Sequence, residues 1–222
     1  MAPCLLLQRQ PAAILRVVGV DDIGHRFDRP SVGQADGQVL FQIGRRNELA
    51  LAQIDAGSAI TEHLLQRGHR RIAFVAAQLD PRTMQRAEGY RRCLRQHGLY
   101  DPKLERLVPE PSSVRLGGEL FTELRQSRPD CDAIFFNNDD LAQGGLLAAL
   151  RLGVAVPDQV AVAGFNDLAG SDQMLPPLTT VHTPRAEIGQ ASAHMLLALM
   201  RGDTPAPNSQ DLGFELRVRG ST

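Results

Sequence analysis

Residues 132–152 read DAIFFNNDDLAQGGLLAALRL, a short apolar run that stops on four polar residues and continues in a helical pattern. The run from Ala133 to Phe136 is continuously apolar, which is typical of a strand buried on both faces. Asn and Asp are strong helix N-caps, so residues 137–140 predict the start of a helix and Gly153 predicts its end. Open α/β sheets bind small ligands where a parallel strand delivers polar side chains onto a helix start.

Strands and helices alternate along the chain from Asp55 onward. Helices are predicted where apolar residues recur at helical spacing, and strands where a short run is continuously apolar. Asp55 can cap the first helix, which ends at Arg67. The further elements are strands at 72–77, 160–165 and 214–218, the last an edge strand, and helices at 81–97, after Ser113 and at 183–202. The alternation predicts an α/β fold with a doubly wound parallel sheet and right-handed crossovers.

Two stretches lack such a pattern. Residues 1–54 contain two short apolar runs that could be strands, separated by charged residues with no periodic face. Residues 168–183 hold no periodic segment and include Pro176 and Pro177, so a long loop is predicted there.

Composition indicates a globular chain and excludes several classes of protein. The 222 residues are 43% hydrophobic, which is enough to bury a substantial core. The 24 basic and 25 acidic residues give a formal net charge of −1, which provides no general attraction to nucleic acid. No apolar run approaches the ~20 residues of a membrane span. The polar residues 8–10 and Pro11 interrupt the first apolar patch, so no secretion signal is predicted and a cytoplasmic location is expected.

No cofactor and no enzymatic activity are predicted. Cys4, Cys93 and Cys131 lie far apart without CxxC spacing, which fits a reducing compartment better than a metal site. The sequence contains no GxSxG, P-loop, GxGxxG or HExxH motif. The enzymatic alternative is a metal held by Asp139 or Asp140 at the end of the strand.

Five ordered segments carry a family resemblance: GHRRIAF (68–74), RxxGY (86–90), NDDLAQGGLLAALRLGVAVPDQVAVAGFND (138–167), PPLTTVHTPRAEIG (176–189) and LGFELRVRGST (212–222). Together they resemble the effector-binding region of LacI/GalR-type repressors. DPRT at 80–83 and the LGFEL ending resemble the gluconate-utilisation branch. The resemblance implies a periplasmic-binding-protein-like fold of type I, in which a sugar-type ligand is held between two α/β lobes.

Two parts of the family pattern are not recognised in this sequence. Members begin with a helix-turn-helix, but no paired helical periodicity with a basic face precedes Asp55. A full first lobe needs roughly 100 residues, whereas only 54 residues precede Asp55. We therefore expect the first lobe to be largely missing, with 1–54 a divergent or remnant segment and 55–222 a sugar- or effector-binding domain. Within that domain, 55–181 and 212–219 are expected to form the C-terminal lobe, and the helix 183–202 to return toward the N-terminal lobe.

Five residues are candidate ligand contacts. By resemblance, Arg86 and Asn138 match ligand-binding positions, and a guanidinium suits carboxylates whereas an amide suits sugar hydroxyls. Asn166 stands where the family usually has a ligand-binding aspartate, which favours a neutral or acidic ligand. Thr83 shares a helical face with Arg86, and Asp139 is a further candidate that also serves as a cap. The structural alternatives are a solvated Arg86 and an Asn138 that only caps its helix.

The predicted function is effector sensing by a LacI-type transcriptional repressor that binds a small sugar or a gluconate-like sugar acid. The resemblance implies a homodimer, and DNA binding only through a helix-turn-helix that this chain is not expected to contain. The alternative is a secreted solute-binding protein for sugar transport, which the missing secretion signal disfavours. With one wall of the cleft missing, the isolated chain is expected to bind sugar acids no more tightly than the millimolar range.

Overall fold

The computed structural model describes residues 15–17, 41–43, 47–50, 53–203 and 209–222. The chain divides into two compact units: the first holds residues 1–50 and 185–212, and the second holds residues 51–184 and 213–222. Most of the predicted remnant segment 1–54 lies outside the described residues. The expectation that no helix-turn-helix precedes Asp55 concerns the same residues and stays a prediction. The domain boundaries expected from the sequence stay a prediction.

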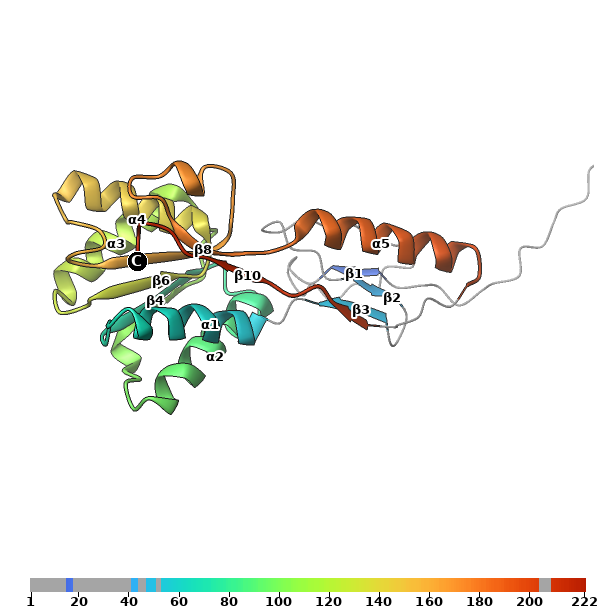
Figure 1. The fold of residues 1–222 in the computed structure, drawn as a ribbon, viewed down its shortest axis with the longest axis horizontal. Helices are drawn as coiled ribbons and strands as arrows, with labels where there is room; N and C mark the ends of the chain where they lie inside the picture. The colour runs from blue at the N-terminus through green and yellow to red at the C-terminus, as the bar shows by residue number, and fades with distance from the viewer. Residues whose placement is uncertain (1–14, 18–40, 44–46, 51–52, 204–208) are drawn as a thin grey trace, which may run out of the picture. The chain divides into compact units, whose positions relative to one another are not determined.

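Among the residues that the structure describes, the first unit contains a four-stranded sheet and one long helix, which can be followed in Figure 1. Strands β1 (Leu15–Val17), β2 (Phe41–Ile43) and β3 (Asn47–Ala50) pair antiparallel in that order, and β9 (Ser209–Asp211) pairs parallel with β3. Helix α5 (Arg185–Met200) follows Pro184, close to its predicted start.

The second unit is a six-stranded sheet with helices on both faces, in the strand order β10-β8-β7-β6-β4-β5. Five strands are parallel and β10 pairs antiparallel at one edge. The doubly wound α/β fold predicted from the sequence is confirmed. The strands are β4 (Ile72–Ala77), β5 (Glu105–Val108), β6 (Ala133–Phe136), β7 (Ala161–Asn166), β8 (Thr179–His182) and β10 (Glu215–Arg217). The helices are α1 (Gln53–Gln66), α2 (Pro81–Gln96), α3 (Val114–Ser127) and α4 (Asp139–Leu152), with short 3-10 turns at Pro102–Leu104 and Ser171–Gln173.

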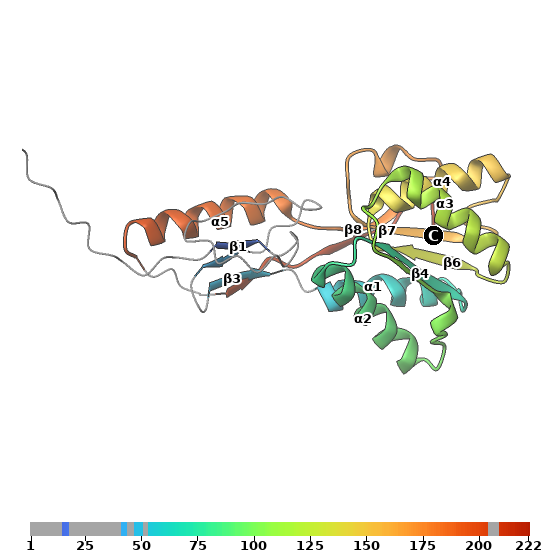
Figure 2. The same cartoon turned by 180° about the vertical axis from the view of Figure 1, so that it is seen from behind.

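Helices α1 and α2 cover one face of this sheet, and α3 and α4 cover the other (Figures 1 and 2). Successive side chains of a strand point to opposite faces, so β4 contributes to two cores. Phe74 packs with Tyr90 in the α1–α2 core, whereas Val75 packs with Phe121 in the α3–α4 core. The Tyr90 hydroxyl also donates a 2.8 Å hydrogen bond to the carbonyl of Ile72, which fixes α2 on the strand.

Glycines allow each helix pair to pack at close range. A Cβ on Gly57 of α1 would lie 2.5 Å from the carbonyl oxygen of Arg86, and a Cβ on Gly89 of α2 would overlap the carbonyl oxygen of Ile54. Gly117 and Gly144 likewise allow α3 and α4 to pack at close range. The position of Arg86 against α1 therefore depends on the absence of these side chains.

The helix starts predicted at residue 81, after Ser113 and within residues 137–140 are confirmed, and so is the helix end at Gly153. Asp80, Ser113 and Asn138 each accept a hydrogen bond from a first-turn N–H of α2, α3 and α4, respectively. Gly153 ends α4 in the left-handed conformation, with φ of 66°. The edge strand predicted at 214–218 is also confirmed by β10.

Three local predictions need correction. Helix α1 begins at Gln53, so Asp55 lies in its first turn and does not cap it. Residues 168–183 were expected to be a long loop, but they contain β8. The threonines of this strand are buried and form hydrogen bonds with distant residues, so the strand shows no apolar pattern in the sequence. Strand β5 was not predicted, because an edge strand with the sequence ERLV is only half-buried.

Candidate functional site

The strand order reverses between β4 and β6. From β4 the chain passes through α2 to β5 on one side, and from β6 it passes through α4 to β7 on the other side. The parallel strands β4, β6, β7 and β8 all end at the same edge of the sheet. In open α/β sheets, ligands bind outside the carboxyl ends of the strands at such a reversal. We therefore place the candidate site at this edge.

Asn137 joins the two strands that flank the reversal. Its main-chain N–H donates a 2.9 Å hydrogen bond to Val75 of β4, and its side-chain amide exchanges two 3.3 Å hydrogen bonds with the main chain of Ala77. The same amide nitrogen donates to the Thr83 hydroxyl at 3.0 Å. The sequence analysis did not single out Asn137, although its place directly after a buried strand was the available signal.

Arg86 is buried at this edge, with 2% of its surface exposed. Its Nε donates to the Gln53 side-chain oxygen at 2.7 Å, and its Nη1 donates to the main-chain carbonyl of Asn137 at 2.6 Å. The guanidinium carbon lies 3.9 Å from the centre of the Phe165 ring, a cation–π contact. The alternative of a solvated helix arginine is therefore wrong, since the side chain is fixed to α1, to the end of β6 and to β7.

Asn138 caps α4. Its side-chain oxygen accepts a 3.1 Å hydrogen bond from the N–H of Leu141, and its amide nitrogen donates to the Ser112 hydroxyl at 2.6 Å. The side chain is buried, and these two contacts use both ends of the amide. The capping alternative is thus observed, and a ligand contact by Asn138 stays a prediction.

Asn166 ends β7 in a backbone conformation that L-residues rarely adopt, with φ of 107°. It is buried, and its Oδ1 has no hydrogen-bond partner among the residues that the structure describes. The same holds for the hydroxyl of Thr183, which directly follows β8. Asn166 pairs with His182 in the sheet, so both atoms belong to neighbouring strand ends. Thr183 was read from the sequence only as a helix start.

Asp139 is fully buried and its carboxylate accepts three hydrogen bonds. The donors are the N–H of Leu168 at 2.7 Å, the Ser171 hydroxyl at 3.1 Å and the Thr180 hydroxyl at 2.7 Å. Burial raises the pKa of this carboxyl above its ordinary value, although the three donors act in the opposite direction. The structure places Asp139 as a tether for β8 and for the loop after β7, and a direct ligand contact stays untested.

Asp167 forms a second polar contact at the end of β7. Its carboxylate accepts a 2.8 Å hydrogen bond from Arg219 and lies 3.0 Å from the Nδ1 of His182. Burial would raise the pKa of Asp167, but Arg219 and His182 together lower it below the ordinary value. This ion-pair group ties the C-terminal segment to β7 and β8.

Two other features lie away from this edge. An open hollow lies between the outer faces of α3 and α4 and is lined by residues such as Arg115, Glu119, Leu147 and Arg151. Within the described ranges, the side chains grouped closely enough to hold a metal ion are Glu62, Cys93 and His97, so neither Asp139 nor Asp140 belongs to such a group. The polar strand ends therefore remain the best candidate for a small-molecule site.

A family model described as a periplasmic binding protein-like domain matches residues 61–222. The HTH-type transcriptional regulator GntR of Pseudomonas aeruginosa is 56% identical over 176 residues, which are 79% of this chain and 51% of that protein. The chain spans about half the length of the curated relatives it matches.

Solved structures show the same similarity. The transcription regulator GntR from Chromobacterium violaceum superposes with a TM-score of 0.77 at 50% identity, covering 78% of this chain and 64% of that chain. The complex of the transcriptional regulator CelR with cellobiose has a TM-score of 0.74 at 30% identity, covering 80% of this chain and 54% of that chain. Among the helices that the structure describes, none has the length and apolar character needed to cross a membrane.

Proposed function

Because this chain belongs to the periplasmic binding protein-like family, as an effector-binding region of the LacI/GalR type near the GntR branch, we propose that it senses a small sugar or sugar acid for a transcriptional regulator. Its relatives are regulators and not enzymes, so the predicted family and the prediction of a non-enzyme are both confirmed. The alternative of a solute-binding protein for sugar transport is not favoured.

Two buried polar atoms provide the main support for a polyhydroxylated ligand. The side-chain oxygens of Asn166 and Thr183 end neighbouring strands and have no hydrogen-bond partner within the described part of the chain. Buried polar atoms in folded proteins nearly always have a partner, so such a pair marks a place where a ligand can bind. An amide oxygen accepts from a sugar hydroxyl, and a threonine hydroxyl can both donate and accept.

The charge at this edge supports a sugar acid such as gluconate. Arg86 places a guanidinium there, and a guanidinium matches the geometry of a carboxylate. Asn166 is neutral where the family usually has an aspartate, so it does not repel a ligand carboxylate as that residue would. The resemblance of residues 80–83 to the gluconate-utilisation branch points in the same direction.

We assign the proposed roles accordingly. Arg86, Asn166, Thr83 and Thr183 contact the effector, with Thr83 oriented by its hydrogen bond from Asn137. Asn138 and Asp139 support the site through the start of α4, since their observed hydrogen-bond partners are protein groups. A direct contact by either residue would add to this set.

The whole regulator is proposed to act as a cytoplasmic homodimer, with DNA bound by a helix-turn-helix of the longer relatives' kind. We keep the proposed boundaries 55–181 and 212–219 for the lobe that carries most of the site, and propose that the helix 183–202, which begins at Thr183, returns toward the other lobe. An effector that closes two lobes would shift a regulator from one state to the other only if its contacts differ between the open and the closed state.

Calorimetric titration of the 222-residue chain with aldonic acids tests this function. Binding of gluconate-like acids is expected, no tighter than the millimolar range, with neutral aldoses of the same length bound more weakly. Asn166→Gly removes the amide and can adopt the positive φ of this position, so it should abolish the signal, while Gln159→Leu on the surface should leave it unchanged. Absence of binding for every sugar and sugar acid would contradict the proposal. A parallel gel-shift with candidate operators is expected to show no specific complex.

A further inference from the structure

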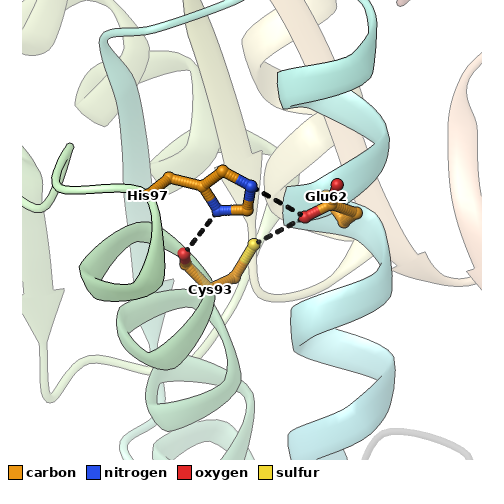
Figure 3. A group of neighbouring side chains, drawn as sticks. All are labelled: Glu62, Cys93 and His97. Atoms are coloured by element: carbon orange, nitrogen blue, oxygen red, sulfur yellow. Dashed lines mark hydrogen bonds and ion pairs between the residues drawn. The ribbon is translucent and has the colours of Figure 1, made fainter.

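Three side chains of types that can bind metals meet between α1 and α2 (Figure 3). They lie toward the end of α2, whereas Thr83 lies in its first turn. Glu62 comes from α1, Cys93 lies near the end of α2 and His97 follows that helix directly. The Glu62 Oε2 atom lies 3.5 Å from the Cys93 sulfur and 3.6 Å from the Nε2 of His97. All three ligand atoms lie within 4.8 Å of one another.

The helix packing explains why these side chains converge. Cys93 and His97 are four residues apart, so they project from the same side of α2. Gly57 and Gly89 hold α1 and α2 in close contact one turn earlier, and the helices run in the same direction from there. Glu62, one turn beyond Gly57, therefore faces the pair on α2.

The orientation of His97 suits a metal ligand. Its Nδ1 lies 2.9 Å from the carbonyl oxygen of Cys93, and a carbonyl only accepts hydrogen bonds, so Nδ1 carries the hydrogen. In the neutral ring, Nε2 then directs a lone pair toward the Glu62 carboxylate. Two acceptors that face each other at this distance leave room for a cation between them. A histidine that donates its other N–H to a backbone carbonyl is the usual arrangement around protein-bound metals.

Two of the three ligand-atom separations fit a tetrahedral ion. Zinc bonds of about 2.3 Å to sulfur and about 2.0 Å to nitrogen or oxygen place neighbouring ligand atoms roughly 3.3–3.5 Å apart. The two measured separations to Glu62 Oε2, 3.5 Å and 3.6 Å, are close to this spacing. The Glu62 and His97 side chains are 41% and 43% exposed, so an ion can enter and water can complete its coordination.

We propose that Glu62, Cys93 and His97 form a binding site for a divalent ion of the zinc type, which joins α1 to α2. Thiolate, imidazole and carboxylate are the ligands that zinc uses in proteins, and three of them leave the fourth position to water. Binding forms one bond each to sulfur, nitrogen and oxygen and releases the Cys93 thiol proton to solvent. The site is separate from the proposed effector site, so an experiment can refute either proposal without refuting the other.

Cobalt(II), which replaces zinc and is coloured, is the probe that tests the site. Titration of the 222-residue chain should give a thiolate-to-cobalt charge-transfer band that saturates at one ion per chain, and zinc should remove it. Cys93→Ser should abolish the band, and Glu62→Gln and His97→Gln should each weaken binding at least about tenfold. The double variant Cys4→Ser/Cys131→Ser keeps Cys93 as the one remaining cysteine and should retain the band.

A second measurement covers the case in which Cys93→Ser does not fold. Zinc should raise the melting temperature of the wild-type chain, because the ion binds only the folded arrangement of α1 and α2. At the same zinc concentration the rise should be clearly smaller for Glu62→Gln. No charge-transfer band at excess cobalt, or the same band in Cys93→Ser, would overturn the proposal. The three residues would then be a hydrogen-bonded cluster only.

Discussion

The Nη1 of Arg86 donates a 2.6 Å hydrogen bond to the main-chain carbonyl of Asn137, which links α2 to the turn after β6. The side chain of Asn137 in turn holds the main chain of Ala77 at the end of β4 and the hydroxyl of Thr83. The carboxyl ends of β4 and β6 are therefore connected through one polar network. A substitution at any of these residues should therefore alter the hydrogen bonds of the others, as is usual in buried polar networks.

Replacement of Arg86 by lysine should destabilise the chain and weaken effector binding. Lysine keeps the charge but cannot bond Gln53 and Asn137 with the fixed geometry of the guanidinium. A buried acceptor left without its donor costs about 1–3 kcal/mol. Urea denaturation should show this loss, whereas Arg92→Lys, whose side chain is 43% exposed on the same helix, should change stability by no more than about 0.5 kcal/mol. Equal effects of the two variants would contradict the role of Arg86.

Replacement of Asn166 by aspartate should separate sugar acids from neutral sugars. The new carboxylate would repel a ligand carboxylate at the strand ends, so affinity for an aldonic acid should fall on the order of tenfold, or about 1.4 kcal/mol. Affinity for a neutral sugar should change much less. Gln159→Glu adds the same charge on the surface and controls for net charge. An equal loss for both ligand types would show that Asn166 does not sense the acid group.

Substitution of two glycines by alanine should have opposite effects on stability. In Gly89→Ala the new Cβ overlaps the carbonyl of Ile54, so α1 and α2 must move apart at a cost of roughly 1–3 kcal/mol, with weaker effector binding through Arg86. In Gly189→Ala the new Cβ meets no atom of the described residues within 4 Å, so α5 should gain about 0.4–1 kcal/mol. Thermal or urea unfolding measures both. A tolerated Gly89→Ala would show that the helix spacing is adjustable.

The stability of the chain should carry a pH dependence from Asp139. Burial raises the pKa of its carboxyl in the folded state above the ordinary 3.8, although Thr180, Leu168 and Ser171 oppose the shift. Above the ordinary pKa the folded state then binds more protons than the unfolded state, so this group's contribution to stability falls as the pH rises toward the raised value.

The variant Asp139→Asn removes that titration. The hydrogen bonds lost in the variant give an offset that does not depend on pH, so the slope is the informative quantity. From about pH 4 to about pH 7, the free energy of unfolding of the variant should rise relative to wild type. Asp172→Asn, on the exposed turn after β7, serves as the surface-charge control. A difference between Asp139→Asn and wild type that stays constant with pH would contradict the prediction.

The sequence was informative wherever structure depends on neighbours in the chain. The structure confirms the strand at residues 133–136, the helix starts at residue 81, after Ser113 and within residues 137–140, and the helix end at Gly153. Each depends on residues within about four positions, because helix caps and strand periodicity are local. Strand β8 was missed because its polar threonines are buried by partners some forty residues away, at Asp139 and Thr222.

The candidate site likewise has features that the sequence predicted and features that depend on the tertiary structure. The sequence by itself determined which polar residues follow the buried strands, Asn138 and Asn166 among them, whereas Arg86 was a candidate through the family resemblance. Only the tertiary structure decided which partners these residues have: Asn137 pairs with Ala77 across a separation of 60 residues, and Arg86 binds Gln53 across 33. The convergence of Glu62 with Cys93 and His97 likewise depends on how α1 packs on α2. The physical reason is that such contacts are set by strand order and helix packing, which no local pattern encodes.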